Sequence, residues 1–181
     1  MTVEDLADKL KSNADFLKIT GGGVTVSGGE PMMQSDFVCD LADALPNMHK
    51  AIQTSGYTDL ETYKRVIDKF DYIMQDIKLA DRQLHKKYTG VYNDNILENI
   101  KYLKQSGKEY ILRVPLIPDI TDTEDNLRAI SEIAGDSPVE LLPYNNLAGA
   151  KYEMLDMEYS LGSDTNRDVD FTKYFKNATI R

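Results

Sequence analysis

Apolar and polar positions follow two rhythms along the chain, one typical of strands and one typical of helices. Five short apolar runs predict strands, at residues 24–27, 50–54, 72–79, 110–116 and 139–142. Between and after them, apolar residues recur at helical spacing over 36–45, 59–69, 81–88, 94–106 and 123–134. Strands that alternate with helices in this way predict parallel βαβ units and an α/β fold.

The two ends of the chain depart from this alternation. Thr2 and Asp5 form a capping-box pattern, and the apolar residues after them predict a helix over residues 3–14. After residue 147 the rhythm stops, and we predict a C-terminal loop with a short closing element over 171–176. A helix thus precedes the first strand, whereas an α/β barrel begins with a strand. The order predicts either an open sheet or a barrel without its first strand, in a single domain over residues 1–181.

Composition limits the partners and the sites. The 21 basic and 30 acidic residues give a formal net charge of −9, which argues against nucleic acid or an anionic membrane as the main partner. A single cysteine allows neither an intramolecular disulfide nor a cysteine-rich metal site within the chain. No apolar run approaches the roughly 18 residues of a membrane span, and the N-terminus is unlike a signal peptide. We expect a soluble, cytoplasmic protein.

Polar groups follow the predicted strands. In α/β folds ligands bind at the carboxyl ends of parallel strands, so these groups are expected to meet at one edge. Asp76 and Lys78 are two residues apart, which places both on the same face of a strand. A carboxylate and an ammonium among apolar neighbours are costly unless they pair or hold a ligand. The pooled charges predict a zwitterionic or multiply polar small molecule.

Each of these groups also has a structural interpretation that the sequence leaves open. Residues 27–30 are also compatible with a simple strand-to-helix turn. Asp76 and Lys78 are compatible with a structural ion pair, and Arg113 with a side chain that extends to the rim. Cys39 lies within an apolar helical stripe, so we interpret it as a small buried residue and not as a ligand.

Six segments, in this order along the chain, carry a resemblance to a known family: GGGVTVSGGEP, QTSGY, DIKLAD, HKKYTGVYNDNILENIKYL, LRVPLIPDITDTEDN and LLPYNNLAGAKYE. Over about residues 2–155 the chain resembles glycyl-radical-enzyme activating enzymes, in the pyruvate formate-lyase activating branch of the radical S-adenosylmethionine superfamily. The resemblance implies a partial, TIM-like (β/α)6 barrel that binds S-adenosylmethionine beside a [4Fe-4S] cluster. It also implies an oxidoreductase of anaerobic metabolism, in which reductive cleavage of the cofactor yields a 5′-deoxyadenosyl radical.

The implied partners are two proteins. The radical takes a hydrogen atom from a glycine of a pyruvate formate-lyase-like glycyl radical enzyme, and a flavodoxin or ferredoxin donates the electron. The resemblance assigns the glycine-rich turn with Glu30 to the methionyl amino group, and the Asp-x-Lys segment to the methionyl carboxylate and, in some members, a monovalent cation. It assigns no catalytic residue and no metal ligand. The predicted cofactor-binding residues are Ser27, Gly28, Gly29, Glu30, Thr54, Asp76, Ile77, Lys78, Arg113 and Asn145.

The chain departs from the family pattern in three places. It has no CxxxCxxC segment, and Cys39 cannot replace the three thiolates that hold such a cluster. Gln53 stands where the family often has Asp, and Asn145 stands where His is frequent. We therefore expect an activating enzyme without its first strand and cluster-binding segment, inactive as these 181 residues. The alternatives are a shortened, non-catalytic binding partner of a glycyl radical enzyme, and another radical enzyme that acts on a small molecule.

Overall fold

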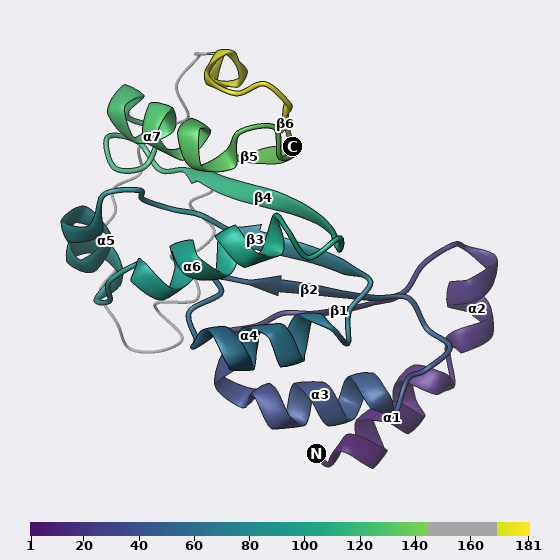
Figure 1. The fold of residues 1–181 in the computed structure, drawn as a ribbon. Coiled ribbons are helices and arrows are strands. Elements are labelled where there is room, and N and C mark those ends of the chain that lie inside the picture. The colour runs from purple at the N-terminus through teal and green to yellow at the C-terminus, as the bar shows by residue number, and fades with distance from the viewer. Residues whose placement is uncertain (145–169) are drawn as a thin grey trace, which may run out of the picture.

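The computed structural model describes residues 1–144 and 170–181, and these residues form an α/β fold around one parallel sheet (Figure 1). Six strands lie in the sheet in their sequence order, and each neighbouring pair is parallel. They are β1 (Val24–Val26), β2 (Lys50–Thr54), β3 (Tyr72–Asp76), β4 (Glu109–Leu116), β5 (Val139–Pro143) and β6 (Ala178–Ile180). Within the described residues the sheet stays open, because β1 and β6 each pair with one neighbour.

The helices that connect the strands lie along one side of this sheet (Figure 1). Strands in sequential order with right-handed crossovers send every connecting helix to the same face, as in a barrel. Figure 1 shows α3, α4 and α6 along that side, and their apolar residues share one core with Ile52 and Ile73. The helices are α1 (Val3–Lys11), α2 (Ala14–Ile19), α3 (Ser35–Asp43), α4 (Leu60–Ile67), α5 (Arg82–Thr89), α6 (Asp94–Leu103) and α7 (Glu124–Ala134), with short 3-10 helices η1 (Pro31–Gln34) and η2 (Phe171–Tyr174). This architecture matches the predicted partial barrel.

The opposite side of the sheet, here called the inner face, carries the polar residues. On β3 the side chains alternate: Ile73 and Gln75 are fully buried against the helices, whereas Met74 and Asp76 are partly exposed on the inner face. Asp76 pairs in register with Arg113 of β4, so a carboxylate and a guanidinium come from neighbouring strands. The period-2 pattern of the sequence therefore separates the core from the candidate site.

Three predicted elements need correction. The helix predicted over 3–14 ends at Lys11, and a second helix, α2, follows it. The strand predicted over 72–79 ends at Asp76. The Ile77 amide still donates to the Arg113 carbonyl of β4, but the carbonyls of residues 78–80 accept from the side chains of Asn93 and Asn126. The sheet has six strands where five were predicted, since Ala178–Ile180, beyond the closing element predicted over 171–176, adds β6 beside β5. The capping box at Thr2 and the strand at 50–54 are confirmed.

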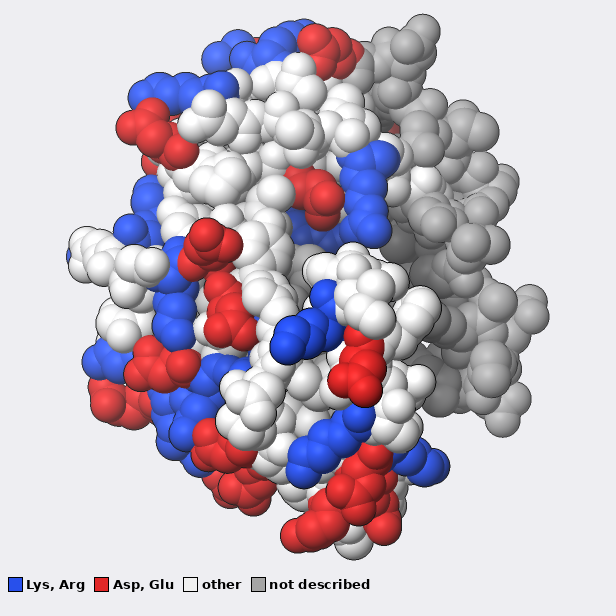
Figure 2. All heavy atoms as spheres, turned by 90° about the vertical axis from the view of Figure 1, so that its right-hand side faces the viewer, with Lys and Arg blue, Asp and Glu red and all other residues white. Residues whose placement is uncertain are grey.

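Charge on the surface is mixed in sign. Figure 2 shows acidic and basic side chains interspersed on the face that lies at the right of Figure 1. The net charge of −9 is therefore not gathered into one acidic field on this face. None of the helices described is long and apolar enough to cross a membrane.

Candidate functional site

A cavity of about 180 Å³ lies at the carboxyl ends of β1, β2 and β3. Seven of the predicted residues line it, so the structure brings together groups that are up to about fifty positions apart. The lining residues are Ser27, Gly28, Gly29, Glu30, Gln53, Thr54, Ser55, Asp76 and Lys78. The cavity thus collects two carboxylates and one ammonium at the edge of the sheet where α/β folds bind ligands.

The glycines after β1 leave backbone open to this cavity. Gly28 has a φ of 129°, in the region that favours glycine over every residue with a side chain. A Cβ atom built at Gly28 or Gly29 would meet no heavy atom within 4 Å, so open space surrounds both positions. The two residues therefore present bare peptide groups to whatever occupies the cavity.

Glu30 holds the glycine turn against β2. Its Oε1 accepts hydrogen bonds from the Thr54 hydroxyl at 2.5 Å and the Met32 amide at 3.1 Å. Its Oε2 accepts from the Ser55 amide at 2.8 Å and the Ser55 hydroxyl at 2.5 Å. A carboxylate has about four lone-pair sites, and these four donors occupy them. Glu30 therefore brings negative charge to the cavity and fixes its wall at the same time.

Asp76 is only half satisfied. Its Oδ2 lies 3.7 Å from Lys78 Nζ, a long ion pair, and its Oδ1 is buried without a hydrogen-bond partner in the described part of the chain. Burial raises the pKa of Asp76, while Lys78 and Arg113 act against that rise. The Lys78 side chain remains 37% exposed. A buried carboxylate oxygen with no donor is costly, and a cationic ligand group would supply one.

Two predicted residues lie elsewhere, and the position of a third is not described. Ile77 packs in the hydrophobic core, away from the cavity, and its amide donates to the Arg113 carbonyl at 2.9 Å. Arg113 is buried, so it does not extend to the rim; its Nε donates to Glu140 Oε2 at 2.8 Å. Asn145 lies outside the described residues.

Sequence reasoning missed Ser55 and Glu140. Ser55 supplies two of the four donors to Glu30, and Glu140 pairs in register with Arg113. A signal for Glu140 existed, since it is the one charge in an apolar strand next to the strand of Arg113.

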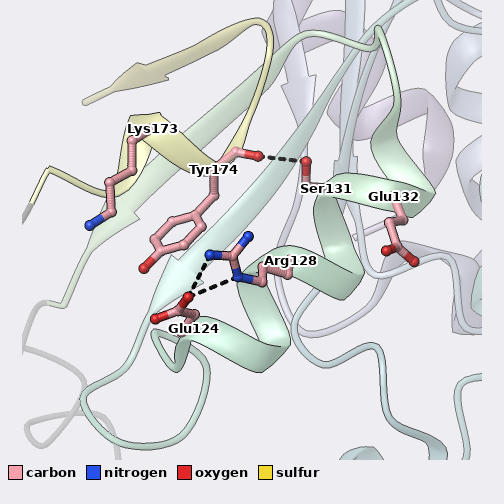
Figure 3. Close-up of a pocket in the computed structure, with 6 residues that line it drawn as sticks. All are labelled: Glu124, Arg128, Ser131, Glu132, Lys173 and Tyr174. Atoms are coloured by element: carbon pink, nitrogen blue, oxygen red, sulfur yellow. Dashed lines mark hydrogen bonds and ion pairs between the residues drawn. The ribbon is translucent and has the colours of Figure 1, made fainter.

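A larger hollow, of about 540 Å³, lies between α7 and η2 (Figure 3). Four of its six lining residues bond in pairs: Arg128 pairs with Glu124 at 2.6 Å, and the Ser131 hydroxyl donates to the Tyr174 carbonyl at 2.6 Å. It is formed where the C-terminal segment packs on α7, and it contains none of the predicted residues. We therefore place the candidate site in the smaller cavity.

The described residues offer no site for a metal cluster. They contain no group of three or more His, Cys, Asp or Glu side chains that could hold a metal ion. Cys39, predicted to be a small buried residue, lies on α3 and is buried in the core that α3 shares with Ile52 and Ile73. Burial raises the pKa of its thiol, which further disfavours a thiolate ligand.

Comparisons with known proteins place the chain in a family. The family model described as the Radical SAM superfamily matches residues 1–129. The trans-4-hydroxy-L-proline dehydratase activating enzyme of Clostridioides difficile is 38% identical over 166 residues, which cover 87% of this chain and 55% of that protein. The (2S)-3-sulfopropanediol dehydratase activating enzyme of Klebsiella oxytoca is 34% identical, over 97% of this chain and 58% of that protein. The chain spans about half the length of the curated relatives it matches.

Solved structures agree with the fold. A domain of pyruvate-formate lyase-activating enzyme from Bacteroides vulgatus matches with a TM-score of 0.67 and 25% identity, over 88% of this chain and 99% of that domain. A radical SAM methyltransferase from Sphaerobacter thermophilus matches all of this chain and 57% of that protein with a TM-score of 0.70 at 14% identity, which bears on the fold alone. The family model, the open parallel sheet and the glycine-lined cavity at its edge together lead to one conclusion: the chain belongs to the radical SAM superfamily.

Proposed function

We propose that this chain binds S-adenosylmethionine in the cavity at the ends of β1, β2 and β3, as part of an activating enzyme for a glycyl radical enzyme. Membership of the radical SAM superfamily implies S-adenosylmethionine and a [4Fe-4S] cluster as cofactors. The observation that carries the proposal is the buried, unpartnered Oδ1 of Asp76 in a cavity that also holds Lys78 and Glu30. A small ligand with a positive and a negative group would pair with the two carboxylates and with the Lys78 ammonium.

The methionyl end of S-adenosylmethionine fits those charges. It carries an ammonium, a carboxylate and a sulfonium, so it needs both acceptors and a cation. We assign Lys78 to the carboxylate, as a point charge on a flexible side chain. We assign the ammonium to the open peptide carbonyls of Gly28 and Gly29 and to the unpartnered Oδ1 of Asp76. Glu30 acts on this ammonium through its charge and through the turn it fixes, because its four donors occupy its oxygens.

The residues of this chain do not fit the cluster. A [4Fe-4S] cluster of this type needs three thiolates, and the 181 residues contain one cysteine, buried in the helix layer. We therefore derive no step through the cluster. The proposal for these residues is cofactor binding, and radical formation is proposed only for an assembly that supplies the thiolates.

The partner is proposed as a class. The curated relatives are named as activating enzymes for a hydroxyproline dehydratase, a sulfopropanediol dehydratase and a hydroxyphenylacetate decarboxylase. These names favour a glycyl radical enzyme as the partner that receives the radical. A pyruvate formate-lyase-like partner is the narrower proposal, supported by the similarity to the Bacteroides vulgatus domain. A flavodoxin or ferredoxin electron donor stays a prediction from sequence.

Calorimetric titration of the chain with S-adenosylmethionine tests the proposal. We expect binding, and weaker binding of 5′-methylthioadenosine, which lacks the charged methionyl end. Asp76→Asn and Lys78→Met are expected to weaken S-adenosylmethionine binding. Arg128→Met, which breaks the ion pair in the larger hollow, is the matched control and is expected to leave binding unchanged. Absence of binding, or equal affinity for the two ligands, would overturn the proposal.

A further inference from the structure

The loop after β3 has its backbone bound by two buried asparagines. Residues 77–80 form no helix or strand, yet they carry Lys78 and adjoin Asp76. Asn93, at the start of α6, donates from Nδ2 to the carbonyls of Leu79 at 3.0 Å and Ala80 at 2.9 Å. This one amide therefore satisfies two successive carbonyls of the loop.

Asn126 of α7 binds the same loop from another helix. Its Nδ2 donates to the Lys78 carbonyl at 3.0 Å and to the Thr121 carbonyl at 2.8 Å. Its Oδ1 accepts from the Ala80 amide at 3.0 Å. Lys78 is thus bound to α7 through its carbonyl, while its side chain lines the cavity.

These hydrogen bonds fix the backbone of Lys78. Its side chain carries the only ammonium among the cavity-lining residues. A lysine side chain has about 2 kcal/mol of rotamer entropy, and a mobile backbone would add further freedom to the position of Nζ. Ligand sites gain affinity when such freedom is removed before binding. The carbonyls of three successive loop residues and the amide of Ala80 are bound by side chains of two helices, which leaves this segment little freedom.

We propose that Asn93 and Asn126 are positioning residues for Lys78 and, through it, for the carboxylate of the bound cofactor. The inference rests on the proposed function, and it adds two residues that touch neither the cavity nor the ligand. Their effect is specific to the negative end of the ligand, since Lys78 is the group whose backbone they hold.

Asn99 of α6 provides a matched control within the same fold. It is buried, and its Nδ2 donates to the carbonyls of Gly56 at 2.8 Å and Thr58 at 3.0 Å. It therefore performs the same chemistry on the loop after β2, which carries no ammonium. A purely structural role would give all three asparagines the same effect on ligand binding.

The test compares S-adenosylmethionine with its decarboxylated analogue, which keeps the ammonium and lacks the carboxylate. Affinities are measured for the parent chain, Asn93→Ala, Asn126→Ala, Asn99→Ala and Lys78→Met, and thermal melting identifies the variants that remain folded. We expect Lys78→Met to weaken S-adenosylmethionine binding about tenfold and to abolish the preference over the analogue. Asn93→Ala and Asn126→Ala are expected to reduce that preference, whereas Asn99→Ala leaves it unchanged.

The double variants Lys78→Met/Asn93→Ala and Lys78→Met/Asn126→Ala complete the cycle. If the asparagines act through Lys78, each double variant binds S-adenosylmethionine no more weakly than Lys78→Met alone. If Asn93→Ala or Asn126→Ala fails to fold, the binding measurements on the other variant decide the question. Should both fail, Asn126→Asp decides, because it keeps the acceptor for the Ala80 amide and removes the donor to the Lys78 carbonyl: a folded Asn126→Asp with an unchanged preference refutes the inference.

Additive losses, or equal losses for the two ligands, also overturn the inference. A parent chain that binds no S-adenosylmethionine contradicts the proposed function instead, so the two failures are distinguishable.

Discussion

Replacement of Glu30 by alanine tests how the cavity wall is held together. The side chain accepts four hydrogen bonds, from Thr54, Met32 and twice from Ser55, and so joins the turn after β1 to the end of β2. The donors of Thr54 and Met32 belong to buried residues, whereas Ser55 is partly exposed, so its amide and hydroxyl can bond to water instead. The cost of Glu30→Ala therefore arises mainly from two donors left without an acceptor.

A hydrogen bond to a charged group contributes about 1.5–3 kcal/mol, so two such losses destabilise the fold by about 3 kcal/mol at the lower end of the range. For a chain of 150–250 residues each kcal/mol shifts the melting temperature by roughly 2–4 °C. We expect Glu30→Ala to lower the melting temperature by about 6–12 °C. Glu30→Gln should lose less, since its carbonyl oxygen still accepts from two donors.

Circular dichroism melts of the ligand-free chain measure this loss. Glu61→Ala is the control: Glu61 is highly exposed and forms one surface ion pair with Lys64 at 2.8 Å, so its removal is expected to leave the melting temperature unchanged. A shift for Glu30→Ala as small as that of Glu61→Ala would refute the argument that Glu30 fixes the wall.

Three further outcomes are expected. Gly56→Ala should unfold at lower temperature in melting experiments, because Gly56 has a φ of 69° and an added Cβ would lie 2.6 Å from the Gln75 amide nitrogen; an unchanged midpoint would contradict this strain. Burial raises the folded-state pKa of Asp76 above 3.8, so ionisation opposes folding and stability falls as the pH rises from that value through the folded pKa. Asp76→Asn should therefore be more stable at neutral pH, with a flatter dependence as the pH rises above 3.8, and parallel curves would refute the assignment. Anaerobic treatment of the chain with iron and sulfide should leave no stable cluster in absorption spectra and iron analysis, since Cys39 is its only thiol, and a stoichiometric cluster would overturn that expectation.

The sequence predicts a strand best where the pattern of apolar and polar positions is enough to define its two ends. Residues 50–54 form a strand with the predicted bounds, and Ala51, Ile52 and Thr54 of this strand are buried. Strand β6 could not be foreseen, because Ala178–Ile180 is three residues long and is a strand through its pairing with β5. Helix α2 was missed for a related reason: Phe16 and Ile19 are exposed, so its apolar residues mark no buried face.

Some residues of the candidate site could likewise be predicted from the sequence, and others could not. The rule that parallel strands end at one edge brings Glu30, Asp76 and Lys78 together, and the cavity contains all three. The rule says nothing about Asn93 and Asn126, because a polar residue on a helix resembles a solvated face until the loop that it binds is known. Partners that come from different elements need the tertiary structure.

The sequential order of the strands has a consequence for how the chain folds. Each strand pairs only with strands that are adjacent to it along the chain, so the pairing of β1 through β5 closes short loops and the contact order stays low for a parallel sheet. Folding can then begin in any βαβ unit and extend to its neighbours, as in repeat proteins. The pairing of β5 with β6 closes a span of 39 residues, from Val139 to Ala178, close to the 37 between Tyr72 and Glu109 of β3 and β4, but it adds a strand of only three residues. In pulse-labelling hydrogen exchange, we expect the amides of β6 to gain protection last.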